Sequence, residues 1–106
     1  MNDQTPKCKI TVVKRTINTE VLGEYLDESY ANLGVCDCMS EGQEFFVGQP
    51  WDMPQGMCAW AWADIRQQIM AVLSDAHLPG MKKKSTAIAG CTDWLRPVIF
   101  YIEKLD

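Results

Sequence analysis

The stretch that decides the fold is AWAWADIRQQIMAVLSDA, residues 59–76. Apolar residues recur in it at intervals of three and four, the spacing that places side chains along one side of an α-helix. Pro79-Gly80 follows the stretch and is a typical helix stop. We therefore predict one long amphipathic helix. Its apolar side consists of Trp62, Ile65, Ile69, Val72, Leu73 and Ala76, and its polar side carries Asp64, Gln67, Gln68 and Asp75.

Short strand-like segments lie on both sides of this helix in the sequence. Residues 8–13 alternate and are rich in β-branched side chains, and residues 43–47 form a shorter segment. Residues 86–91 consist mostly of small residues, and residues 98–102 are apolar on both faces. A strand of the last kind is expected at the centre of a sheet or at a subunit contact. Because strands and helices do not alternate strictly, we predict an α+β fold. Its sheet should be small and mostly antiparallel, with the long helix packed across it.

A second, shorter helix is predicted within residues 16–30, near the N-terminus. Val21, Leu22, Tyr25 and Leu26 would share one side of it, and Asn18 or Thr19 would cap it. A polar loop over residues 29–42 and a proline-containing segment over residues 48–56 complete the organisation. With 106 residues, we expect a single α+β domain over residues 7–106, preceded by a disordered or loosely ordered N-terminus over residues 1–6.

The composition narrows the range of partners. The formal net charge is −4, and the only basic run is Lys82-Lys83-Lys84, which is typical of a solvated loop. This balance argues against sequence-independent binding to nucleic acid, which needs clustered positive charge. No apolar run has the length of a membrane span, and residues 1–6 do not look like a secretion signal. We therefore expect a cytoplasmic protein whose five cysteines are reduced thiols.

Cysteines are the main candidates for chemistry, because thiolates are soft metal ligands and good nucleophiles. Cys36 and Cys38 form a C-x-C pair on a loop, Cys58 precedes the long helix, and Cys91 ends a predicted strand. These four are candidate ligands for zinc, copper or an iron–sulfur centre, although the usual pair of C-x-x-C zinc knuckles is absent. The alternative, strongest for Cys8 and Cys91, is that the cysteines are small buried hydrophobic residues.

Tryptophans accompany two of these cysteines. Trp60 falls on the polar side of the long helix, and Trp94 falls in the turn after Cys91. Together with Trp51 they are candidates for lining a ligand or cofactor pocket, or for a subunit interface, where aromatic residues are enriched. Packing beneath the proline-containing loop is the alternative for them.

Three charged or titratable residues complete the candidates. Asp93 and Arg96 stand three apart around a predicted turn and are candidates for acid–base chemistry and anion binding. The alternative is that Asp93 accepts hydrogen bonds from its own turn and pairs with Arg96. The only histidine, His77, follows the long helix, where it would either bind the last carbonyl groups or act as a base.

Four segments stand out together: CKITVVKR at 8–15, EGQEF at 41–45, MCAWAWADI at 57–65 and CTDWLRPVIF at 91–100. In combination they resemble a conserved family of small, cysteine-containing bacterial and archaeal proteins. Cys36 and Cys58 match two cysteines of the family pattern, whereas Gly90 and Trp94 stand where that family often has cysteine and glycine. The resemblance covers the chain from Cys8 onward and implies no particular reaction.

These observations predict a thiol protein in which Cys36, Cys58 and Cys91 cluster, with Cys38 as a fourth member. The clustered thiols would be either ligands of a soft metal or iron–sulfur centre, or redox-active thiols. One alternative is a non-catalytic subunit of a homo-oligomer with a tryptophan-rich interface. Another is a small-molecule enzyme with Cys58 as nucleophile and Asp93 or His77 as base. The candidate catalytic residues are thus Cys58, Cys91, Asp93 and Arg96, and the candidate binding residues are Trp60 and Trp94.

Overall fold

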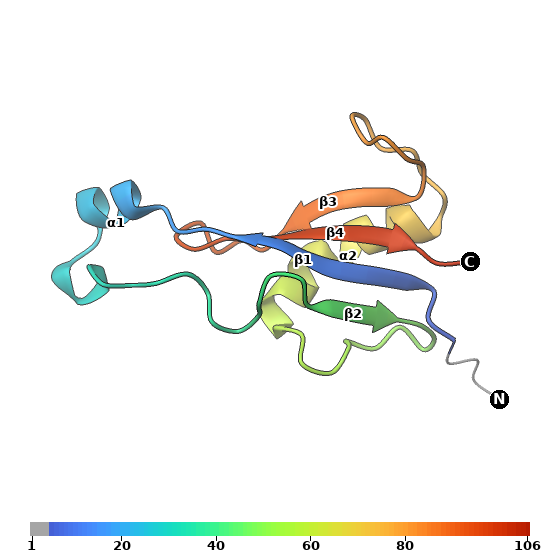
Figure 1. The fold of residues 1–106 in the computed structure, drawn as a ribbon, viewed down its shortest axis with the longest axis horizontal. Coiled ribbons are helices and arrows are strands. Elements are labelled where there is room, and N and C mark those ends of the chain that lie inside the picture. Colours follow the sequence, from blue (N-terminus) through green and yellow to red (C-terminus); the bar gives the residue numbers. More distant parts are fainter. Residues whose placement is uncertain (1–4) are drawn as a thin grey trace.

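A four-stranded antiparallel sheet with one long helix across a face forms the centre of the computed structural model, which describes residues 5–106 (Figure 1). Along the sheet the strands follow the order β2-β1-β4-β3, and every neighbouring pair is antiparallel. The α+β prediction is therefore confirmed. The elements are β1 (Cys8–Arg15), β2 (Glu44–Val47), α2 (Ala59–Leu73), β3 (Thr86–Gly90) and β4 (Val98–Lys104).

The apolar side of α2 and one face of the sheet form the core. Trp62, Ile65, Ile69 and Val72 are buried, as the spacing in the sequence predicts. They belong to the same contiguous cluster as the buried residues of the two central strands. That cluster includes Ile10, Val12, Val98, Phe100 and Ile102.

The helix ends earlier than expected, at Leu73 instead of residue 76. Asp75 adopts a left-handed conformation with φ of 63°, and the amide of Ala76 donates to the carbonyl of Ala71 at 3.1 Å. The amide of Asp75 donates to Val72, so the end is a Schellman motif with aspartate where glycine is usual. The predicted end was wrong because it rested on glycine as the usual helix stop, and the first glycine after the helix is Gly80.

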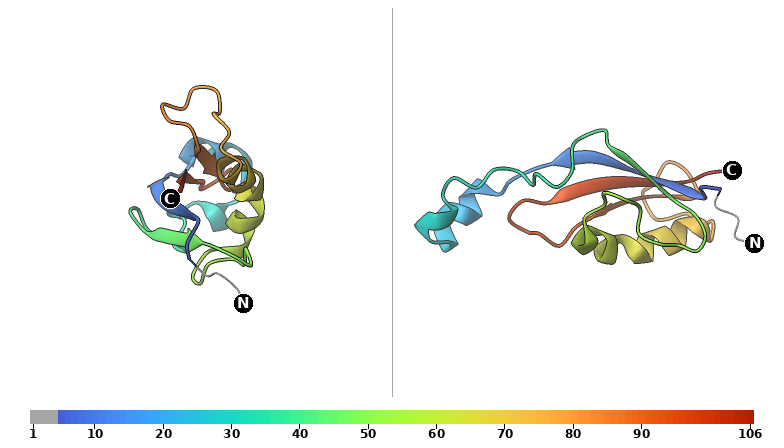
Figure 2. Two further views of the ribbon diagram at one scale, coloured as in Figure 1. Left: turned by 90° about the vertical axis from the view of Figure 1, so that its right-hand side faces the viewer. Right: turned by 90° about the horizontal axis from the view of Figure 1, so that it is seen from below.

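Strand β4 occupies a central position, which confirms the prediction from its apolar sequence. Phe100 and Ile102 are fully buried on the face that α2 covers, whereas Ile99 and Tyr101 are partly exposed on the other face. Figure 2 shows α2 on one side of the sheet only.

A short helix near the N-terminus is also confirmed, as α1 (Thr19–Tyr25), and is followed by the 3-10 helix η1 (Glu28–Tyr30). Residues 16–35, called the arm below, extend beyond the sheet at one end of the molecule (Figure 1). The radius of gyration of 15.5 Å exceeds the roughly 13 Å of a compact chain of this length, in keeping with this elongated shape.

Two details of the arm correct the expectations. Of the apolar side predicted for α1 only Leu22 is buried, while Val21 is 40% and Tyr25 is 77% exposed. Asn18 stands at the N-cap but makes no capping bond, because its side-chain amide donates instead to the carbonyl of Trp94 at 2.5 Å.

The loosely ordered N-terminus expected over residues 1–6 falls largely on residues 1–4, which lie outside the described residues. Thr5 and Pro6 are exposed and belong to no helix or strand.

Candidate functional site

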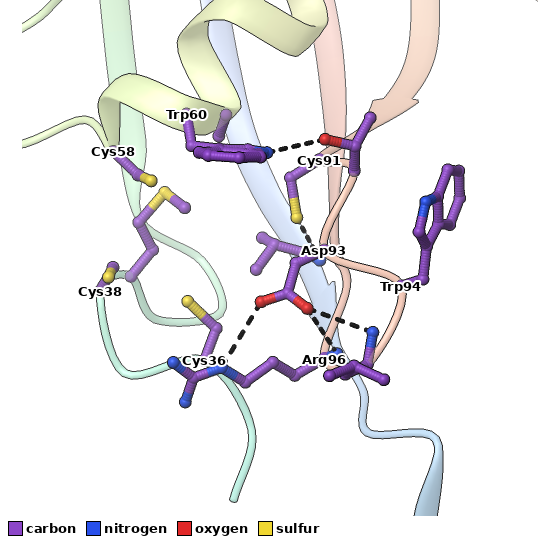
Figure 3. Close-up of a pocket in the computed structure, with 13 residues that line it drawn as sticks. Cys36, Cys38, Cys58, Trp60, Cys91, Asp93, Trp94 and Arg96 are labelled. Carbon is purple, nitrogen blue, oxygen red and sulfur yellow. Dashed lines mark hydrogen bonds and ion pairs between the residues drawn. The ribbon is translucent and has the colours of Figure 1, made fainter. Parts of the chain in front are cut away.

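One cavity of about 530 Å³ brings together eight of the candidate site residues chosen from the sequence (Figure 3). It lies where three element ends meet: the N-terminus of α2, the loop between β3 and β4, and the C-x-C loop between the arm and β2. The predicted convergence of these distant segments is therefore observed. The candidates that line the cavity are Cys36, Cys38, Cys58, Trp60, Cys91, Asp93, Trp94 and Arg96.

Arg15, the last residue of β1, holds the C-x-C loop in place. Its Nη1 donates to the carbonyl oxygens of Cys36 at 2.7 Å and Met39 at 2.9 Å. Its Nε and Nη2 contact the carboxylate of Glu41 at 3.0 and 2.9 Å. The hydrogen bond to Glu41 raises the pKa of Arg15, and the same bond lowers the pKa of Glu41. This clamp joins the loop to the sheet and was not foreseen from the sequence.

Cys36 and Cys38 both line the cavity, and the pKa of Cys38 depends on its neighbour. A side-chain hydrogen bond with Cys36, followed by the charge of Cys36, raises the pKa of Cys38 above its usual value. The charge of Cys58 adds to this increase, and Cys58 lines the same cavity. Figure 3 shows these three sulfur atoms on the same side of the cavity. The pair therefore resists carrying two negative charges at once.

Cys91 lies apart from the other three thiols (Figure 3). Its sulfur accepts a hydrogen bond from the backbone amide of Val98 at 3.3 Å, which holds the thiol against the start of β4. The fifth cysteine, Cys8, is fully buried in β1, and burial raises its pKa to about 11. The view of Cys8 as a packed hydrophobic residue is therefore correct.

Residues 5–106 contain no group of three or more His, Cys, Asp or Glu side chains that could hold a metal ion as they stand. The cysteine ligand set predicted from the sequence thus shares a cavity without being arranged for coordination. The sulfur atoms of these cysteines are nevertheless the kind of ligand that soft metals prefer.

A chain of hydrogen bonds joins α2 to the β3–β4 loop along one wall of the cavity. The indole Nε1 of Trp60 donates to the hydroxyl of Thr92 at 2.7 Å, and that hydroxyl donates to the carboxylate of Asp64 at 2.9 Å. The amide of Thr92 donates to the same carboxylate at 2.6 Å. The sequence interpretation missed Thr92 and treated Asp64 only as part of a polar surface. The four-residue spacing of Trp60 and Asp64 was the available signal.

Asp93 and Arg96 adopt the second arrangement considered, in which Asp93 accepts hydrogen bonds from its own turn and pairs with Arg96. Asp93 Oδ1 accepts from the amides of Leu95 and Arg96 at 3.1 and 3.2 Å, and its Oδ2 lies 3.5 Å from Arg96 Nε. The pair therefore stabilises its own turn while facing the cavity. Trp94 is 73% exposed, so it presents an aromatic ring to solvent at the rim.

Two other candidates lie elsewhere. His77 follows α2 at the end far from Cys58, where its Nε2 is 3.0 Å from the carbonyl of Met81, so it neither binds the last carbonyls of the helix nor lines the cavity. Trp51 belongs to the segment after β2 and does not line the cavity either.

Comparisons with known proteins give no match to a family model, to a curated protein or to a solved structure. The family resemblance of the four sequence segments therefore stays a prediction. Among residues 5–106, no helix combines the length and apolar character needed to cross a membrane.

Proposed function

We propose that the cavity is a thiol redox site in which Cys36 and Cys38 alternate between dithiol and disulfide. The C-x-C spacing and the place of Cys36 and Cys38 on the same side of the cavity carry the proposal. The chain bends over residues 37–39. Residues two apart can bring their Cα atoms within the roughly 4.4–6.8 Å that a disulfide spans.

The electrostatics of the pair suggest different roles for the two thiols. Because the pKa of Cys38 is raised, Cys38 retains its proton and suits the resolving position, whereas Cys36 suits the attacking position. The Cys36 thiolate would attack one sulfur of a substrate disulfide, form a mixed disulfide and release the first substrate thiolate. Cys38 would then lose its proton and attack the Cys36 sulfur, which releases the second thiolate. The substrate gains two electrons and two protons, and the protein is left with a Cys36–Cys38 disulfide.

The surroundings of the pair favour a small or peptidic disulfide as substrate. The cavity volume of about 530 Å³ is typical of a small-molecule site, and Met39, Ala61 and Val98 contribute apolar lining. Trp60 and the Asp93–Arg96 pair offer stacking and polar contacts across from the thiols. We place this cycle in the cytoplasm, where glutathione and thioredoxin would reduce the Cys36–Cys38 disulfide again.

The test is to equilibrate the protein in buffers with graded ratios of reduced to oxidised dithiothreitol and to determine disulfides by mass spectrometry. We expect a reversible loss of two hydrogens, mapped to Cys36 and Cys38. Cys36→Ser and Cys38→Ser should abolish it, and Cys91→Ser is the matched control that should retain it. Absence of this disulfide in the wild-type protein at every ratio would refute the proposal.

Soft-metal binding is the second candidate, favoured by the gathering of Cys36, Cys38 and Cys58 on one side of the cavity. Three thiolates suit copper(I), zinc or an iron–sulfur centre. Protein prepared without oxygen should then contain stoichiometric metal, or iron with inorganic sulfide, and Cys58→Ser should remove it. Metal-free protein with an intact redox disulfide would decide against this candidate.

Two further predictions from the sequence stay open. A homo-oligomer interface built on the tryptophans is supported by the exposure of Trp60, at 66%, and of Trp94. An enzyme with Cys58 as nucleophile is supported by its place at the N-cap of α2, where a helix favours negative charge.

A further inference from the structure

The arm presents apolar side chains that no other part of residues 5–106 covers, among them Val21, Tyr25 and Tyr30. α1 packs closely against no strand and not against α2, and Tyr25 extends into solvent with most of its surface exposed. A helix of seven residues is too short to be stable in water without tertiary contacts. The arm therefore has the properties of a segment that is stabilised by a partner.

Charge on the arm selects the kind of partner. Glu20, Glu24 and Glu28 are exposed, and none of them forms an ion pair within residues 5–106. No lysine or arginine occurs anywhere between residues 16 and 65. A surface that accepts the arm should accordingly be basic.

A basic surface with a suitable cavity lies toward the other end of the same molecule. The loop that precedes β3 carries Lys82 and Lys83, which are exposed and, in the part of the chain that the structure describes, form no ion pair. Beside them is a cavity of about 230 Å³, large enough for one aromatic ring. Its lining consists of Gly80, Met81, Lys82, Lys83, Thr86 and Tyr101.

We propose that the arm docks on a second copy of this chain, with Tyr25 seated in the cavity beside Lys82 and Lys83. Glu24 and Glu28, which flank Tyr25 in sequence, would then face those lysines. Met81 and Tyr101 supply an apolar and aromatic lining for the ring.

The positions of the two surfaces suit a two-fold arrangement. The arm lies at one end of the long axis, and the loop before β3 lies toward the other end (Figure 1). Two copies with antiparallel long axes therefore form the contact twice, as an isologous dimer requires. This inference does not depend on the redox proposal, because neither surface contains a residue of the thiol cavity.

The test is sedimentation equilibrium under reducing conditions, so that no intermolecular disulfide contributes. The wild-type chain should reach twice its 12.0 kDa mass. Tyr25→Ala should raise the dimer dissociation constant by about thirtyfold or more, as for a central aromatic anchor, while Tyr25→Phe should stay close to wild type. Circular dichroism should report a folded chain for each variant, since Tyr25 is exposed.

Charge reversal provides the decisive control. E24K/E28K and K82E/K83E should each weaken the dimer, and an equimolar mixture of the two should restore it, because both contacts of the mixed dimer then join opposite charges. The matched controls Asp52→Lys and Lys14→Glu change exposed charges elsewhere and should leave the dimer unchanged. A wild-type monomer at about 100 µM, a dimer insensitive to Tyr25→Ala, a mixture that stays monomeric, or open-ended assembly would each overturn the proposal.

Discussion

Replacement of Thr92 by valine tests how the thiol cavity is held together. Valine keeps the shape of threonine but lacks the hydroxyl group. The substitution would remove the bond to the Asp64 carboxylate at 2.9 Å and the acceptor for Trp60 Nε1 at 2.7 Å. The backbone bond from the Thr92 amide to Asp64 at 2.6 Å would remain. The change thus isolates the side-chain part of the link between α2 and the β3–β4 loop.

The expected loss follows from the type and exposure of these bonds. A neutral hydrogen bond contributes about 1 kcal/mol to stability, and one to a charged group contributes about 1.5–3 kcal/mol. The lower values add up to about 2.5 kcal/mol for the two bonds. Because Thr92 and Trp60 are exposed, water replaces part of what is lost, and the net loss is smaller than that sum. We therefore expect the free energy of unfolding to fall by about 1.5 kcal/mol. For a chain of this size the melting temperature should fall by about 6 °C.

Urea unfolding followed by tryptophan fluorescence, with dithiothreitol present, measures this difference. Thr92→Ser retains the hydroxyl and should lose less than about 0.5 kcal/mol. Thr11→Val is a matched control on β1, because the hydroxyl of Thr11 has no hydrogen-bond partner among the described residues. The reasoning would fail if Thr92→Val were as stable as this control, or if serine were as damaging as valine.

Three further predictions concern the thiols and the core. Alkylation of Cys38 should require a pH above its usual pKa of 9.0, since interaction with Cys36 raises that pKa, and Cys36→Ser should move the profile to lower pH. Arg15→Met should speed amide hydrogen exchange across residues 34–42, because two loop carbonyls lose their donor, while the core stays protected. Ile65→Ala should lower the free energy of unfolding by about 2–5 kcal/mol in a denaturant titration, since Ile65 is fully buried.

Each of these three predictions has a control variant. Cys91→Ser should leave the pH profile of Cys38 unchanged, because Cys91 contributes nothing to that pKa, and an unshifted profile in Cys36→Ser would contradict the first prediction. Arg66→Met removes an arginine that lies 4.9 Å over the ring of Trp62, away from the loop, and should not affect exchange there. Met70→Ala, on the exposed side of α2, should cost far less than Ile65→Ala.

The fold class could be predicted because its signals are local. The three-and-four spacing in α2 and the alternation in β1 reflect which side chains lie on one face of a helix or strand, and that depends only on neighbours in sequence. The end of α2 was predicted wrongly, because Asp75 takes the left-handed position that the sequence rule assigns to glycine. Asp75 is held there by Ser85 at 2.8 Å and Lys104 at 2.9 Å, which are distant in sequence.

For the candidate site, too, the sequence predicted some features and the tertiary structure decided others. By itself the sequence indicated that Cys36, Cys38, Cys58 and Cys91 stand at element ends, where loops of a small domain gather. Only the tertiary structure decided that the first three lie on the same side of the cavity and that Cys91 accepts a hydrogen bond from the amide of Val98.

The sequence alone determined the elements of this protein and the residue types that surround its cavity. The tertiary structure decided their mutual contacts: Arg15 with Cys36 across 21 residues, Trp60 with Thr92 across 32, and an arm left without cover. The physical reason is that periodicity follows from short-range backbone geometry, whereas such contacts depend on how strands pair and on where α2 crosses the sheet. Neither of these is encoded in any single segment.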